Sequence, residues 1–173
     1  MKIQSFFLLV LSLTVLNASL FAEENVYSKG DLLGSAGVSV YHFGAIVAGD
    51  YGLHDLFSAG IAAGYNGYSF VPQVRTHQVP LVARLAFHPF NLSAIADKIV
   101  VRTMIDVYAG ICGGWVFRWQ TSERGILLDE QEKGSFAIRE YIGMRYYFKE
   151  NIALFVEDNG PLSYIGGGIT YKF

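Results

Sequence analysis

Apolar and polar residues alternate with a period of two along much of this chain. The segment from Met104 to Gln120 collects apolar or small side chains on one face, namely Ile105, Val107, Ala109, Ile111, Gly113, Trp115, Phe117 and Trp119. Its other face carries small and polar side chains, namely Asp106, Tyr108, Gly110, Cys112, Gly114 and Arg118. A helix would scatter both sets around its axis, so the alternation predicts a β-strand.

The same alternation recurs before and after this segment. Strands are predicted at residues 33–41, 45–53, 57–68, 79–88, 104–120, 135–149, 152–158 and 162–173. In residues 135–149, Glu140 interrupts the apolar face. We expect it to lie at the level of lipid headgroups or to be turned by a bulge.

Composition shows what kind of sheet these strands form. Hydrophobic residues make up 52% of the chain and charged residues only 16%, whereas soluble domains average about 25% charged residues. Beyond the first 22 residues no apolar run is long enough for a transmembrane helix. A free sheet edge is not tolerated in lipid. The sequence therefore predicts an all-β fold, an eight-stranded antiparallel up-and-down transmembrane β-barrel.

Residues 1–22 have the pattern of a cleaved secretory signal peptide. One cation, Lys2, precedes a short uncharged apolar run, and an acidic, polar segment follows it. Cleavage after Ala22 is expected, with a cut near Ala18 or Ser19 as an alternative and an uncleaved anchor as another. Residues 23–173 then form the outer-membrane barrel domain.

Charge and cysteine content exclude some classes of protein. Residues 1–22 contain one lysine and no acid, so their removal makes the formal net charge one unit more negative than −2. This predicts no nucleic-acid partner. The single cysteine, Cys112, cannot form an internal disulfide and is expected to be a packed side chain.

The connections follow from a periplasmic N-terminus. Outer loops are predicted at residues 41–45, 70–78, 120–134 and 157–161. Turns on the periplasmic side are predicted at residues 52–56, 149–151 and 89–102, the last with a short helix at residues 92–98.

Charged side chains on the small-residue faces should fill the barrel interior. The inward-facing arginines are predicted to be Arg84, Arg139, Arg145 and Arg118, and their carboxylate partners to be Asp50, Asp106 and Glu157. The lumen of an eight-stranded barrel is about as wide as the side chains that fill it, so these groups should form a packed ionic plug. A selective polar conduit or a titratable gate is the alternative.

No pattern in the chain indicates catalysis, a metal site or a cofactor. The four histidines, His42, His54, His77 and His88, fall on different strand ends and turns, and none stands beside a serine in a deacylase-like pairing. The glycines at 166–168 lie in a predicted strand, where they indicate close packing. We therefore expect a non-enzymatic protein without a cofactor.

Three segments carry a family resemblance. The segment G-M-R-Y-Y-F-K-E-N-I-A-L-F-V-E and the final L-S-Y-I-G-G-G-I-T-Y-K-F resemble the closing strands of small bacterial outer-membrane barrels of the OmpA/OmpX/OmpW type. R-L-A-F-H-P at 84–89 and D-V-Y-A-G at 106–110 resemble their middle strands, particularly those of spirochaetal members. The first two strands depart from the family in their very short connecting loop.

The resemblance implies a location and several partners. Such proteins lie in the cell outer membrane, contact its lipid and are inserted by the barrel assembly machinery, for which Phe173, with Tyr171 and Ile169 on the same outward face, resembles the recognition signal. Outward aromatic residues near strand ends read as interfacial girdles, namely Trp115, Phe117, Trp119, Tyr146, Phe148, Tyr171 and Phe173. A monomer is expected.

Two roles are consistent with these features. The first is a structural envelope barrel or a passage for small hydrophobic solutes. The second is an adhesin or ligand-binding barrel that acts through partly apolar outer loops toward a host surface partner. A soluble, lipocalin-type barrel is the alternative outside the membrane, and it would need apolar side chains inside rather than outside.

Overall fold

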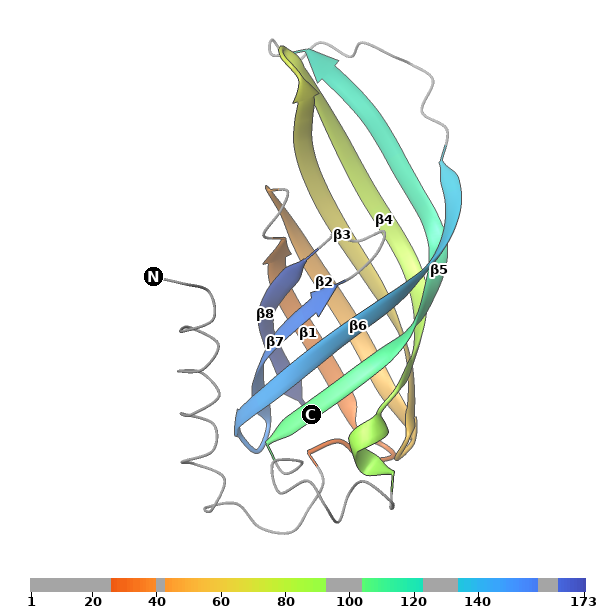
Figure 1. The fold of residues 1–173 in the computed structure, drawn as a ribbon, viewed down its shortest axis with the longest axis vertical. Coiled ribbons are helices and arrows are strands. Elements are labelled where there is room, and N and C mark those ends of the chain that lie inside the picture. The colour runs from red at the N-terminus through yellow and green to blue at the C-terminus, as the bar shows by residue number, and fades with distance from the viewer. Residues whose placement is uncertain (1–25, 40–42, 93–103, 123–133, 159–164) are drawn as a thin grey trace.

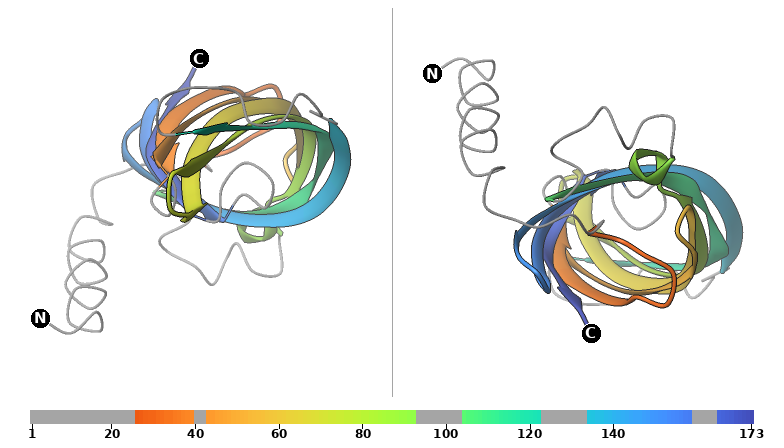
Figure 2. Two further views of the ribbon diagram at one scale, coloured as in Figure 1. Left: turned by 90° about the horizontal axis from the view of Figure 1, so that it is seen from above. Right: turned by 90° about the horizontal axis from the view of Figure 1, so that it is seen from below.

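The computed structural model describes residues 26–39, 43–92, 104–122, 134–158 and 165–173. They form eight antiparallel strands, β1 Leu32–Ser39, β2 Phe43–His54, β3 Phe57–Val71, β4 Val74–Phe87, β5 Ile105–Ser122, β6 Ser135–Lys149, β7 Ile152–Asp158 and β8 Gly166–Lys172. Each strand pairs with its neighbour in sequence, and β8 pairs with β1, so the sheet closes into a barrel (Figures 1 and 2). The predicted fold class is confirmed.

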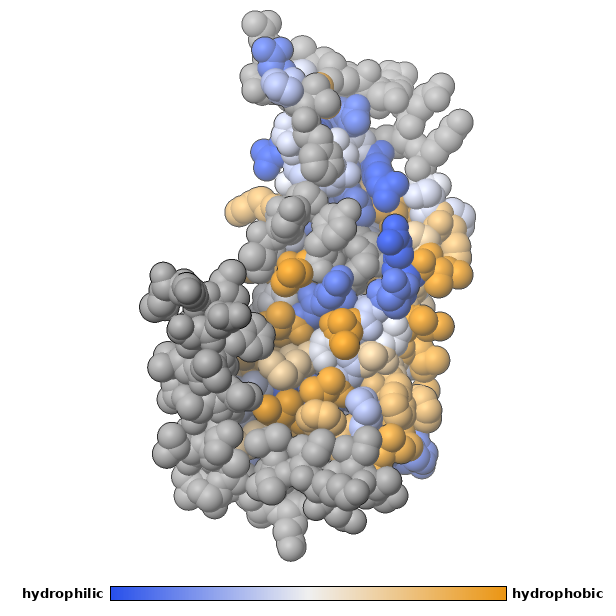
Figure 3. Space-filling view, viewed as in Figure 1, coloured by the Kyte–Doolittle hydropathy of each residue, from blue (hydrophilic) through white to orange (hydrophobic). Residues whose placement is uncertain are grey.

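The strands point their apolar side chains away from the lumen. On β4, Leu81, Ala83 and Leu85 are exposed, whereas the alternating residues Val82, Arg84 and Ala86 are buried. On the face shown in Figure 3, hydrophobic side chains gather mainly over the lower and middle part of the barrel and hydrophilic ones mainly above. The outward direction of the apolar side chains is the reverse of what a soluble lipocalin-type barrel needs, since such a barrel has an apolar interior.

The strands β3, β4 and β5 reach much farther toward one end of the barrel than β1, β7 and β8 do (Figure 1). We call the end to which they extend the upper end. The predicted outer loop at residues 70–78 is wrong, because β3 continues to Val71, β4 begins at Val74, and only Pro72 and Gln73 connect them. Polar residues such as Arg75 and Gln78 do not end the strand here, because the backbone hydrogen bonds between neighbouring strands do not depend on apolar side chains.

Short segments cover the lower end. Residues 26–31 run under the barrel, where Gly30 N–H donates to Gly52 O and Gly52 N–H donates to Asp31 O. The η1 turn, Pro89–Asn91, follows β4, and the Asn91 amide donates to the carbonyls of Tyr27 and Asp55. The predicted helix at residues 92–98 falls almost wholly outside the described residues, as does the predicted signal peptide at residues 1–22.

Glu140 remains on the outward face. It pairs with Ile111 in a β5–β6 ladder whose register runs without a shift, and its side chain is exposed. The bulge considered for it is absent from this ladder. No helix among the described residues has the length and apolar character needed to cross a membrane.

Candidate functional site

A cluster of ion pairs crosses the lumen in the lower half of the barrel. Arg84 on β4 makes a bidentate contact with Glu157 on β7, with Nη1–Oε1 and Nη2–Oε2 distances of 3.1 and 2.8 Å. Its Nε also lies 3.0 Å from Oδ1 of Asp50 on β2. All three side chains are buried. Because β2, β4 and β7 lie on different sides of the barrel, these contacts bridge the interior.

A second arginine continues the same cluster. Arg145 on β6 places Nη2 at 2.8 Å from Asp50 Oδ2 and Nη1 at 3.0 Å from Asp106 Oδ2. Asp50 therefore lies between the two guanidinium groups. We call Asp50, Arg84, Asp106, Arg145 and Glu157 the lumen cluster, and it joins side chains from five strands.

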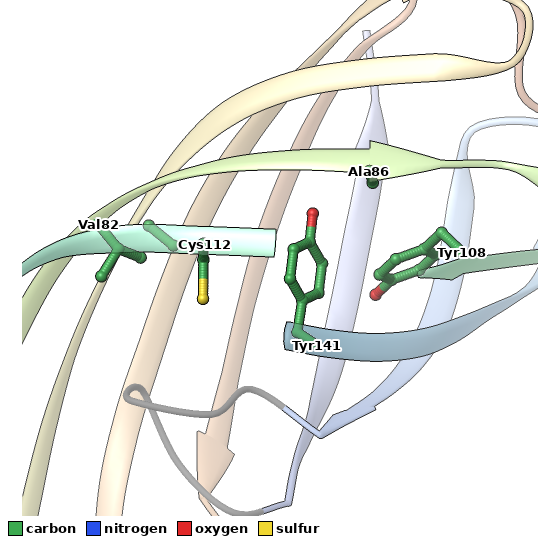
Figure 4. Close-up of a cluster of buried hydrophobic side chains, with 6 residues drawn as sticks. Val82, Ala86, Tyr108, Cys112 and Tyr141 are labelled. Carbon is green, nitrogen blue, oxygen red and sulfur yellow. The ribbon is translucent and has the colours of Figure 1, made fainter. Parts of the chain in front are cut away.

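Tyrosine rings pack against both guanidinium groups. Tyr108 donates to Glu157 Oε2 at 2.6 Å, and the Arg145 guanidinium carbon lies 4.1 Å from the Tyr108 ring centroid. The Arg84 guanidinium carbon lies 4.5 Å from the Tyr141 centroid. Figure 4 shows Tyr108 and Tyr141 together with Val82, Ala86 and Cys112 in the adjoining apolar part of the interior. Arginines stacked and paired in this way need little water.

A histidine closes the lower side of the cluster. His88 Nδ1 lies 2.7 Å from Asp106 Oδ1, and its Nε2 lies 3.0 Å from Ser58 Oγ. The Tyr27 ring stacks on the imidazole at 3.7 Å between centroids, and its hydroxyl donates to Phe57 O at 2.8 Å. Burial raises the pKa of the Tyr27 hydroxyl, which favours its neutral donor form.

The Ser58, His88 and Asp106 side chains stand in the order of a nucleophile, a base and an orienting acid. The sequence does not indicate this arrangement, because the three residues lie far apart in the chain and no local motif marks them. His88 is 0% exposed and Ser58 2% exposed, and the Tyr27 ring stacks on the imidazole. The row connects the lower end of the barrel to Asp106 of the lumen cluster by hydrogen bonds.

The charges of the cluster nearly balance. Three carboxylates face two guanidinium groups, so the cluster carries one net negative charge when His88 is neutral and none when His88 is protonated. Burying these groups together is tolerable because every charge has an opposite partner within 3.1 Å. All five side chains of the cluster are buried.

The structure brings together most, but not all, of the predicted lumen charges. Arg84, Arg145, Asp106, Glu157 and also Asp50 meet in the cluster. Arg139 does not join them: it is exposed and makes no ion pair with a described residue. The pleat of β6 places Arg139 on the same side as Tyr141 and Arg145, but the described β6–β7 pairing ends at Ile142, three residues before Arg139, so no described residue of β7 lies opposite it.

Arg118 is also outside the cluster. It is exposed on β5, beyond the buried Val116 and toward the upper end of the barrel. The pleat places its side chain on the lumen side, as the alternation indicated, but at a level where no carboxylate of a described residue meets it. Facing inward and being paired are therefore separate properties.

Cys112 and the last residues of the chain lie outside the lumen cluster. Cys112 is buried, and its thiol donates to Arg139 O at 3.5 Å. Ile169, Tyr171 and Phe173 are exposed on the outward face of the β8 end, with the Tyr171 and Phe173 rings 4.8 Å apart. Among the described residues no group of three or more histidine, cysteine or acidic side chains is placed to hold a metal ion.

A shallow pocket of about 800 Å³ lies at the upper end, on the outward side of β3, β4 and β5. Side chains around it include Tyr65, Ser69, Arg75, His77, Trp119 and Thr121. The alternation predicted strands through part of this region but did not indicate a site, because the residues come from three strands.

Comparison with solved structures identifies the architecture. The outer membrane protein OprG from Pseudomonas aeruginosa superposes with a TM-score of 0.52 at 12% identity, over 85% of this chain and 97% of that one. The fold is that of a small outer-membrane β-barrel. Neisserial surface protein A matches with a TM-score of 0.47 at 12% identity, covering 83% of this chain and 94% of its own.

A third structure is similar at a lower level. Ail, the attachment invasion locus protein of Yersinia pestis, matches with a TM-score of 0.41 at 10% identity, over 84% of this chain and 99% of its own. No family model and no curated protein matches the sequence. The finer resemblance to OmpA/OmpX/OmpW-type and spirochaetal proteins therefore stays a prediction.

Proposed function

We propose that this chain is an integral outer-membrane β-barrel with a structural role in the envelope, and that its lumen does not conduct ions. The lumen cluster carries the proposal. Paired charges from β2, β4, β5, β6 and β7 meet in the interior, and a plug held by mutual ion pairs leaves no continuous water column at that level.

The outward surface supports the membrane location. Apolar side chains that are half exposed or more cover the barrel exterior, among them Ile61, Leu81, Ile111, Ile138 and Leu154. A protein in water would hide such a surface, whereas lipid satisfies it. Insertion by the barrel assembly machinery, through the outward row of Ile169, Tyr171 and Phe173, belongs to the same proposal.

The proposal includes no enzymatic activity. The only serine, histidine and aspartate that stand in catalytic order among the described residues are those under Tyr27. Passage of small hydrophobic solutes is less well supported than a structural role, because a route straight through the lumen would have to cross the buried arginines and carboxylates.

Conductance in planar bilayers tests the closed lumen. We expect the purified protein to show no unitary current steps. The double variant Arg84→Ala/Glu157→Ala removes one charge of each sign, which avoids the cost of about 3–5 kcal/mol for leaving a single buried charge unpaired. It should therefore fold and show a measurable leak.

Arg139→Ala is the control, because it removes an exposed arginine outside the cluster. Heat-dependent gel mobility establishes that each variant is folded. Stable open channels in the unmodified protein would overturn the proposal, and so would a folded double variant that is as silent as the control.

A second candidate function is binding at the cell surface. The upper pocket favours it, because it lies on the part of β3, β4 and β5 that extends beyond the other strands. The ligand that this pocket fits is argued next.

A further inference from the structure

The wall of the upper pocket is held by a row of side chains from three strands. The Tyr65 hydroxyl on β3 lies 2.6 Å from His77 Nδ1 on β4, and His77 Nε2 lies 2.9 Å from Thr121 Oγ1 on β5. The imidazole also stacks on the Trp119 ring, with centroids 5.2 Å apart and planes 14° apart. Both imidazole nitrogens are thus engaged, and His77 acts as a fixed structural element of the wall.

Arg75 contributes a positive charge that has no partner among the described residues. Its side chain is exposed, and it makes no ion pair or hydrogen bond with any of the described residues. An added Cβ at Gly67 would come 3.3 Å from both Nε and Nη2 of Arg75. The guanidinium therefore lies over the bare backbone of Gly67, beside the Tyr65 hydroxyl, with its donors available.

The position of the pocket along β4 shows its level relative to the apolar band of the barrel. On β4 the outward face is apolar from Phe87 to Val79, and the polar stretch begins at His77, ten residues from Phe87. Ten residues rise about 33 Å along a strand, and a tilt of about 40° reduces this to about 25 Å. This equals the usual height of the apolar band of such barrels, about 25 Å.

Aromatic side chains mark both edges of that band. Phe57 and Phe87 contact each other at the lower edge, with centroids 5.5 Å apart. Tyr65 and Trp119 lie at the upper edge, in the same region as His77. Interfacial aromatic residues take these positions in membrane barrels. Arg75, two residues beyond His77, then lies at the level of the outer headgroups.

The side chains of the pocket select a ligand class. Its lining contains the guanidinium of Arg75, hydroxyls of Tyr65, Ser69 and Thr121, and the Trp119 ring. Among the described residues it includes no aspartate or glutamate. A guanidinium suits a phosphate group. Hydroxyls and an aromatic edge suit the polar rim and apolar face of a sugar ring.

We propose that this pocket binds the phosphorylated sugar headgroup of an outer-leaflet glycolipid. The proposal rests on the proposed membrane location but not on the closed lumen. In the bound state the phosphate pairs with Arg75, the sugar lies along Trp119 and Tyr65, and the acyl chains run down the apolar face of β4 and β5 past Val79 and Phe117.

Binding of lipid A by the detergent-solubilised full chain tests this proposal. Native mass spectrometry and titration should show saturable binding of bisphosphorylated lipid A and weaker binding of the dephosphorylated lipid with the same acyl chains. Arg75→Ala should raise the dissociation constant for the phosphorylated lipid about tenfold or more. It should leave that for the dephosphorylated lipid unchanged, and Arg75→Lys should lie between.

Arg118→Ala is the matched control. Arg118 is an exposed arginine on β5 near the same level, but on the lumen side of the wall, so its loss removes the same charge without touching the pocket. Heat-dependent gel mobility shows that the variants are folded. Equal losses in Arg75→Ala and Arg118→Ala, or equal binding of both lipids, would overturn the proposal.

Glucose 1-phosphate separates the two sources of the headgroup chemistry. We expect no measurable binding of this free sugar phosphate, because it lacks the chains that the apolar face holds. Binding of it as tight as that of lipid A would show a soluble ligand and overturn the lipid assignment. If the protein binds no lipid A and shows no current in planar bilayers, only the lipid-binding proposal is wrong. If it binds lipid A through Arg75 but conducts ions, only the proposal of a closed lumen is wrong.

Discussion

Gly143 shows how one missing side chain lets the lumen cluster pack. It lies on the lumen face of β6, opposite Tyr108 on β5, and a Cβ at this position would clash with the Tyr108 ring. Tyr108 in turn donates to Glu157 and stacks on Arg145. The glycine is therefore required by close packing, not by an unusual backbone conformation.

Gly143→Ala should lower the free energy of unfolding by about 1–3 kcal/mol, because the tyrosine must move away from both charged partners. Urea titration in detergent micelles measures the free energy of unfolding, with the β-sheet signal in far-UV circular dichroism as the readout. Gly49→Ala is the control, since a Cβ there meets no atom within 4 Å. Equal stability of the two variants would contradict the packing role of Gly143.

The β3–β4 hairpin is the element that the sequence misplaced. The run of polar residues around Arg75 and His77 predicts a loop, yet the ladder continues through them to a two-residue turn at Pro72 and Gln73. Gln73 has a φ of 71°, in the left-handed region that residues other than glycine and asparagine rarely adopt. Because the turn is this short, β3 and β4 stay paired up to Val71 and Val74 and form the wall of the upper pocket.

Substitutions at Gln73 should separate turn strain from other effects. Gln73→Gly should keep or raise stability by about 0.5 kcal/mol, because glycine adopts positive φ without a Cβ penalty. Gln73→Val should lower it by about 1–2 kcal/mol, because a β-branched residue fits that conformation worst. Unfolding midpoints in one detergent measure both, and the reverse order would show that the turn does not hold this conformation.

The molecule as a whole is organised around depth in a lipid layer. Leu81 is 54% exposed near the middle of the apolar band on β4, and Leu53 is 51% exposed beside the lower turn that follows β2. In water an arginine at either position would be nearly neutral. In a bilayer the cost of an arginine depends on its depth.

Leu81→Arg should therefore cost about 2–4 kcal/mol of folding free energy in lipid vesicles, and Leu53→Arg about 0–1 kcal/mol. Equilibrium unfolding from vesicles, with lipid of fixed thickness, measures the difference. Similar costs for the two variants would mean that the band on β4 is not the membrane-spanning layer.

Sequence analysis predicted most of the fold because a period of two is a local property. The alternation on residues 135–149 and 152–158 matches β6 and β7 to the residue. It also indicates which face Arg84, Asp106, Arg145 and Glu157 occupy. It could not show that Arg139 has no ion-pair partner among the described residues, because that depends on which residues of other strands reach its level.

By itself, the sequence determined the alternation, and with it the strand number, the outward apolar face and the inward position of the charges, since each follows from neighbours along one strand. Tertiary structure alone decided which charges meet, that His88 joins Ser58 to Asp106, and that Arg75 and Trp119 line one pocket. These contacts join residues from different strands, and their distances depend on the register and closure of the whole sheet.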